Sequence, residues 1–126
     1  MSLHNYKQFI YSAPERPGDV EAVGDFVIQP CEPWFSEAEQ VLVRRSLESQ
    51  LEDFYDCWLV IRDGGKPVST LWFHLGGDAN RTGIMGYALT DPEHRGGGLQ
   101  SRNFEAVVEL ADKMGSRMLM LGTANP

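Results

Sequence analysis

Three consecutive glycines that directly follow an arginine form the part of this sequence best suited to bind an anion. The segment Arg95-Gly96-Gly97-Gly98-Leu99-Gln100 stands directly before a stretch with helical periodicity. A helix begins with amide hydrogens that lack partners, and its dipole adds positive charge there. Consecutive glycines allow the dihedrals of an anion-binding nest and a close ligand approach, while Arg95 adds a charged fork. The alternative is an ordinary flexible loop or helix cap.

Two common nucleotide-binding motifs do not fit these glycines. A dinucleotide-binding turn needs a third glycine three residues after the second, within alternating parallel strands and helices. A Walker P-loop needs Gly-Lys-Ser/Thr, which does not follow Gly98. The segment therefore predicts a phosphate-binding turn of another kind.

Hydrophobic periodicity places this turn between a strand and a helix. Residues 84–90 are typical of a strand, and residues 99–114 carry apolar side chains at helical spacing. Gly115 is well placed to end that helix. Because a helix connects them, the next strand, at residues 117–121, is expected to run parallel to residues 84–90.

The middle of the chain predicts an antiparallel meander. Residues 57–62 and 68–75 are rich in strand formers and are joined by Asp63-Gly64-Gly65-Lys66, which supplies the positive φ of a hairpin turn. Residues 6–11 predict an earlier strand. Residues 29–35 contain two prolines and are expected to form a loop.

Two helices are expected in the first half of the chain. The first covers residues 19–26, although Gly24 interrupts it. The second opens with a capping box, in which Ser36 and Glu39 each bond a free amide of the first turn. Its apolar stripe recurs at helical spacing as far as residue 54.

Composition limits the classes of protein that this chain can be. Its 126 residues predict a single domain, and 42% hydrophobic residues suit an ordinary globular core. A net charge of −7 without a basic run disfavours nucleic-acid binding. Cys31 and Cys57 are too few and too far apart for a zinc site or a disulfide framework. The sequence shows neither a membrane-length apolar run nor a secretion signal, so a cytoplasmic location is expected.

The glycine turn and its helix together resemble a known family. Residues 89–111, from Leu89-Thr90-Asp91-Pro92 through the glycines to the helix, resemble the signature segment of the GNAT superfamily of acetyl-CoA-dependent N-acetyltransferases. The family pattern is Arg/Gln-x-x-Gly-x-Gly/Ala after a hydrophobic-x-x-Pro approach. Arg95 and Gly98 match it, whereas Gln100 replaces the usual small residue. Residues 118–126 are similar to the strand that follows in the family.

This resemblance implies an α/β fold with a mixed, mostly antiparallel sheet and helices on both faces. It implies acetyl-CoA as co-substrate, no metal, and an amine acceptor that is a small molecule or a peptide. In the family, pantetheine lies in a gap between the strands that correspond to residues 84–90 and 117–121. The implied coenzyme-binding residues are Leu89, Thr90, Arg95, Gly96, Gly97, Gly98, Leu99, Gln100 and Asn125.

The acid-base groups and the acceptor site are less defined. An amine must lose a proton when it attacks a thioester, and the nearest titratable candidates are His74 and Tyr87. Each has a structural alternative, as a capped strand histidine and a packed tyrosine. By resemblance, Trp34 and Phe35 would overhang the acceptor, or else fill the core below their loop.

The family fold normally continues with a helix, a tyrosine and two more strands, whereas this chain stops at Pro126. The expectation is therefore a GNAT-like domain that is truncated at its C-terminus. A last strand without a neighbour would be an open edge, which favours a homodimer. The alternatives to an enzyme are a silent CoA-binding module and a self-associating fragment with a structural role.

Overall fold

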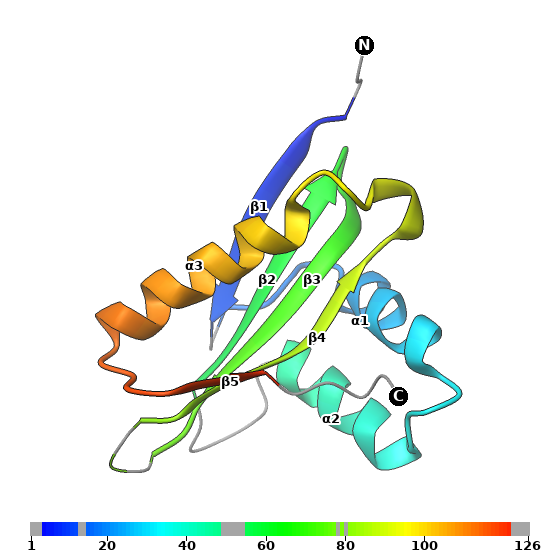
Figure 1. Cartoon of the computed structure of the whole chain (residues 1–126). Coiled ribbons are helices and arrows are strands. Elements are labelled where there is room, and N and C mark those ends of the chain that lie inside the picture. The colour runs from blue at the N-terminus through cyan, green and yellow to red at the C-terminus, as the bar shows by residue number, and fades with distance from the viewer. Residues whose placement is uncertain (1–3, 13–14, 49–54, 78, 80, 122–126) are drawn as a thin grey trace.

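A five-stranded sheet forms the centre of the computed structural model, which describes residues 4–12, 15–48, 55–77, 79 and 81–121. The strands lie side by side in chain order (Figure 1): β1 (Tyr6–Ser12), β2 (Tyr55–Asp63), β3 (Lys66–Leu75), β4 (Gly83–Thr90) and β5 (Leu119–Leu121). The first four are antiparallel to their neighbours, and β5 is parallel to β4. The predicted mixed, mostly antiparallel sheet is confirmed.

Helices cover both faces of this sheet, as expected (Figure 1). One face carries α1 (Val20–Ile28) and α2 (Glu37–Leu47), and the other carries α3 (Leu99–Lys113). Two short 3₁₀ helices, η1 (Gln29–Cys31) and η2 (Pro92–His94), follow α1 and β4. Within the described ranges, none of the helices has the length and apolar character needed to cross a membrane.

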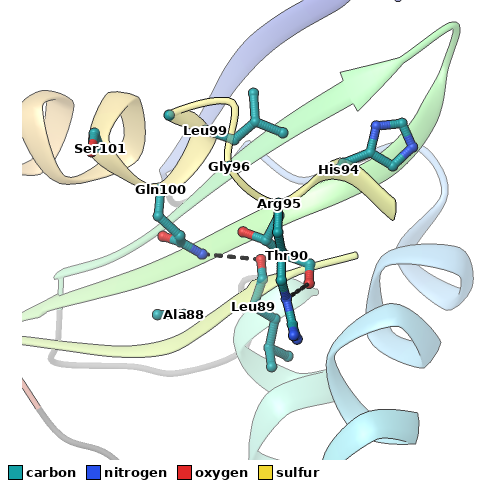
Figure 2. A pocket seen from close by; sticks show the side chains of 10 residues that line it. Ala88, Leu89, Thr90, His94, Arg95, Gly96, Leu99, Gln100 and Ser101 are labelled. Carbon is teal, nitrogen blue, oxygen red and sulfur yellow. Dashed lines mark hydrogen bonds between the residues drawn. The ribbon is translucent and has the colours of Figure 1, made fainter. Parts of the chain in front are cut away.

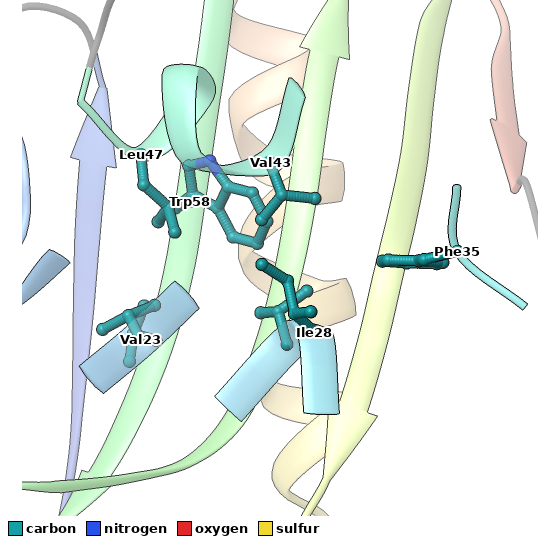
Figure 3. Packing of buried hydrophobic residues seen from close by; sticks show 8 residues of the cluster. Val23, Ile28, Phe35, Val43, Leu47 and Trp58 are labelled. Carbon is teal, nitrogen blue, oxygen red and sulfur yellow. The ribbon is translucent and has the colours of Figure 1, made fainter. Parts of the chain in front are cut away.

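Strand β2 is buried on both faces because its alternate side chains face opposite helix layers. Trp58 packs with Val43 and Leu47 in the cluster under α1 and α2 (Figure 3). Its neighbours Cys57 and Leu59 belong to the cluster under α3. The sheet therefore forms the shared wall of two cores.

Helix α1 continues through Gly24, so the expected interruption does not occur. A Cβ atom at Gly24 would lie 3.0 Å from Arg44 Nη1 and 3.7 Å from Leu47 Cδ1, both on α2. This glycine therefore lets two helices approach closely. The predicted loop at 29–35 was partly wrong, because residues Gln29–Cys31 form η1, with Pro30 in the first turn where its missing N–H costs nothing.

The predicted start of the second helix is confirmed. Ser36 is the N-cap of α2, and its Oγ accepts the backbone N–H of Glu39 at 3.2 Å. The described helix ends at Leu47, and the rest of its predicted extent, at residues 49–54, lies outside the described residues.

Two irregularities decide which side chains face each other in the meander. The β2–β3 register shifts between Ile61 and Arg62, and the β3–β4 register shifts between Thr70 and Trp72. Tyr87 lies opposite the second shift with φ of 50°, and Thr70 Oγ1 donates to its carbonyl at 3.1 Å. Because a one-residue slip moves a side chain to the other face, these bulges fix the composition of the site.

Candidate functional site

The predicted glycine turn lines a cavity of about 330 Å³ where β4 ends and α3 begins. Figure 2 shows its lining residues, which come from β4, η2, the turn at residues 95–98 and the first turn of α3. The lining residues are Ala88, Leu89, Thr90, His94, Arg95, Gly96, Gly98, Leu99, Gln100 and Ser101. The structure thus brings most of the predicted coenzyme-binding residues together. Gly97 belongs to the same turn but does not line the cavity, and Asn125 lies outside the described residues.

The backbone of this turn requires glycine at two positions. Gly96 and Gly98 have φ of 81° and 78°, in the left-handed region that other residues avoid. A Cβ atom at either position would meet nothing within 4 Å, so the space beside the backbone is open. Gly98 is the N-cap of α3 and supplies no side-chain cap, and the first turn contains no acidic residue. This helix start can therefore accept an anion.

Side chains near the turn donate hydrogen bonds to the backbone carbonyls at the end of β4. Gln100 Nε2 donates to the carbonyl of Leu89 at 3.0 Å, and Arg95 Nε donates to the carbonyl of Thr90 at 3.3 Å (Figure 2). Gln100 Nε2 also donates to the carbonyl of Thr70 on β3 at 2.9 Å. The carbonyls of Leu89 and Thr90, two of the implied coenzyme-binding residues, therefore already accept hydrogen bonds from within the chain. Gln100 is long enough to bridge two strands, which a small residue cannot do.

Gln100 also has one hydrogen-bond acceptor that is not satisfied. Its Oε1 is buried and has no hydrogen-bond partner among the described residues. A buried amide oxygen without a donor costs free energy, on the order of 1–3 kcal/mol. The site therefore offers an acceptor to a ligand N–H or to a water.

A second group of side chains surrounds His74 on β3. His74 Nδ1 lies 3.0 Å from Asp56 Oδ1 on β2. Ser46 Oγ of α2 donates to Asp56 Oδ2 at 3.1 Å and accepts the indole N–H of Trp58 at 2.7 Å. Asp56 and Ser46 are each only 5% exposed, so this carboxylate has fixed donors in place of water. The arrangement orients the His74 ring.

Tyr87 lies close to this group through ring contacts. The Trp72 ring stacks on His74 at 5.4 Å and lies 5.6 Å from the Tyr87 ring. Burial, followed by the charges of Glu39, Cys31 and Asp56, raises the pKa of Tyr87. The phenol is thus protonated at neutral pH, which suits an acid better than a base.

The two residues predicted to contact the amine acceptor, Trp34 and Phe35, have different surroundings. Phe35 is buried and packs edge-on against Tyr87, with ring centroids 5.7 Å apart. Trp34 is 52% exposed. An effect of Phe35 on an acceptor would pass through Tyr87, whereas Trp34 offers a surface for direct contact.

Sequence reasoning missed the residues that support His74 and part of the cavity wall. Asp56, Ser46 and Trp72 were not predicted as site residues, and neither was His94. Only the pairing of β2 with β3 places Asp56 beside His74. The available signal was a carboxylate directly before the apolar run at residues 57–61, since a buried charge needs a partner.

Comparisons with known proteins identify the family and the fold. The family model described as "Acetyltransferase (GNAT) family" matches residues 22–126. No curated protein matches the chain significantly in sequence. Solved structures resemble it at low identity, so they support the fold alone.

Three of these structures represent the range. A ribosomal-protein-alanine N-acetyltransferase from Brucella melitensis biovar Abortus superposes with a TM-score of 0.71 at 13% identity, covering 94% of this chain and 80% of that one. An aminoglycoside N-acetyltransferase in complex with CoA gives 0.69 at 12% identity, covering 98% and 81%. A glucosamine-6-phosphate N-acetyltransferase from Arabidopsis thaliana gives 0.64 at 16% identity, covering 94% and 82%.

Proposed function

This chain belongs to the acetyltransferase (GNAT) family, and from that premise we propose that it transfers an acetyl group from acetyl-CoA to an amine. The observation that carries the proposal is the cavity at the glycine turn, where an uncapped helix start, two left-handed glycines and Arg95 surround open space. A diphosphate fits these groups, because it needs amide donors and positive charge.

The coenzyme is proposed to extend from this turn along β4. Its diphosphate contacts the backbone of Gly96 to Gly98 and the Arg95 guanidinium, and an amide N–H of its arm satisfies Gln100 Oε1. From Thr90 back to Tyr87 the strand spans about 10 Å at ~3.3 Å per residue. The thioester then lies nearer the bulge than the turn, on the side of the candidate acid-base groups.

The proposed reaction is direct transfer. The amine nitrogen attacks the thioester carbonyl, the new C–N bond forms and the C–S bond breaks. His74, held by Asp56, takes the amine proton, and Tyr87 gives its proton to the departing thiolate. A thiol acyl carrier is not needed, and Cys57 is unsuited to that role, because burial raises its pKa to about 12.

Coenzyme binding is tested with one matched pair of variants. Isothermal titration with acetyl-CoA should give saturable binding to the wild type and none to Gly98→Asp, which sets a carboxylate against the diphosphate. Gly115→Asp is the control, because Gly115 has a similar φ of 73° and open space at the other end of α3. An equal loss of acetyl-CoA affinity in both variants, or no binding by the wild type, would contradict the proposal.

Catalysis is tested by thiol release from acetyl-CoA with a panel of amines. His74→Gln and Asp56→Asn should lower kcat by about 10²–10⁴-fold, the usual contribution of a general base, without weakening acetyl-CoA binding. Binding with no thiol release from any amine would favour a CoA-binding module. Unchanged kcat in both variants would remove His74 from the mechanism.

A further inference from the structure

A separate cluster of side chains that can act as metal ligands lies beside the glycine turn. His4 precedes β1, Asp63 ends β2, and His94 ends η2. One ligand atom from each residue lies within 4.8 Å of the other two. From this geometry we propose that His4, Asp63 and His94 bind a transition-metal dication of the Zn²⁺ class. The proposal does not depend on the acetyltransferase reaction.

The atoms that would not touch the metal are already held in place. Asp63 Oδ1 accepts the backbone N–H of Asn5 at 2.8 Å, which directs Oδ2 toward His4 Nδ1 at 2.7 Å. His94 Nδ1 lies 2.8 Å from the Tyr6 hydroxyl. If Nδ1 donates that bond, Nε2 of the neutral ring is the ligand. Bonds of this kind orient the ligands in metal sites.

Charge and ligand type favour a dication that accepts nitrogen. Two neutral imidazoles and a carboxylate suit Zn²⁺, Cu²⁺ or Ni²⁺ better than Mg²⁺ or Ca²⁺, which prefer oxygen alone. Asp91 Oδ2 lies 4.0 Å from His94 Nε2 and offers a second carboxylate nearby. Together the two carboxylates balance the charge of the ion.

Metal binding would require a small contraction of the cluster. Tetrahedral zinc with bonds of ~2.1 Å keeps its ligand atoms about 3.4 Å apart. In the structure, the candidate ligand atoms lie within 4.8 Å of one another. The His4 side chain is 44% exposed and can move, whereas His94 is 10% exposed and anchored by Tyr6. Closure therefore draws the start of β1 toward η2.

The site would connect three parts of the chain at the edge of the proposed coenzyme cavity. His94 lines that cavity next to Arg95 (Figure 2). A bound ion would fix η2, and with it the entry to the glycine turn. Binding of the metal is therefore expected to raise the melting temperature.

The test is titration of tag-free protein with Co²⁺ and Zn²⁺. Wild type should bind one ion per chain, with a cobalt spectrum of imidazole and oxygen ligands and no thiolate charge-transfer band. His94→Gln and Asp63→Asn should each weaken binding by at least about tenfold, and Tyr6→Phe, which removes only an outer contact, by about tenfold. His74→Gln is the matched control and should bind like the wild type.

Several outcomes would overturn the site. These are no saturable binding, a thiolate band that indicates Cys31, or equal affinity in wild type and His94→Gln. Folding of each variant is checked by circular dichroism. A zinc-dependent rise in melting temperature that persists in both His94→Gln and Asp63→Asn would also contradict the proposal.

Discussion

A single buried arginine ties the first helix to the sheet. Arg62 is 8% exposed on β2, and its two terminal nitrogens donate to Asp19 at 2.8 and 2.6 Å, at the start of α1. Hydrogen bonds from Arg62 are the main cause of the lowered pKa of Asp19. A carboxyl whose pKa is lowered by folding stabilises the fold above its unfolded pKa, and this stabilisation is lost as pH falls through the folded pKa.

At the residue scale, we therefore expect Asp19→Asn to lower the free energy of unfolding by about 1 kcal/mol at pH 7. The difference from wild type should begin to shrink below about pH 4, where Asp19 of the unfolded chain takes up a proton, and should disappear only below the lowered pKa of the folded state. Urea unfolding at pH 7 and pH 3 measures both values. Asp25→Asn is the control, because the Asp25–Arg44 pair is exposed and contributes little. A pH-independent difference would contradict the linkage.

At the element scale, the parallel pairing of β4 with β5 depends on a glycine. A Cβ atom at Gly83 would lie 2.6 Å from Phe73 Cε1 and 2.7 Å from Leu119 Cδ2. Phe73 is fully buried under α3. The strand that leads to the cavity at the glycine turn therefore starts at a point where only glycine fits.

We expect Gly83→Ala to destabilise the protein by about 1–3 kcal/mol through overpacking. The urea midpoint measures the effect. Gly77→Ala provides the comparison, because a Cβ atom there meets nothing within 4 Å. Equal midpoints for the two variants would show that Phe73 and Leu119 can move apart without cost.

At the scale of the whole molecule, β5 is the last strand of the described sheet. Met118, Met120 and Leu121 are each about half exposed. Leu119 instead packs against the cluster under α3, so its substitution would test the core rather than the surface. An apolar strand edge of this kind can pair with a second copy.

If that pairing occurs, wild type should be a dimer by light scattering, and Met120→Lys should be a monomer because it places a charge on the edge. Ile84, opposite Met120 on β4, is also exposed, so the change need not disturb a core. Lys7→Glu on the opposite edge strand is the control. A wild-type monomer at high concentration would refute self-association through β5.

The sequence by itself determined the features whose causes are local. Gly96 and Gly98 must adopt positive φ before a helix, Ser36 must cap α2, and the Gly64-Gly65 turn must join two strands. Each depends on a few neighbouring residues and their dihedrals, so the glycine turn and the meander could be predicted.

Tertiary structure decided which distant side chains meet. Without a bulge, the register set by Asp63 and Lys66 would place Asp56 opposite Phe73, whereas the shift at Ile61 and Arg62 pairs it with His74. The meeting of His4 with Asp63 and His94 likewise depends on how β1 and η2 lie in space. A register shift of one residue is a small difference in packing, and no local rule sets it.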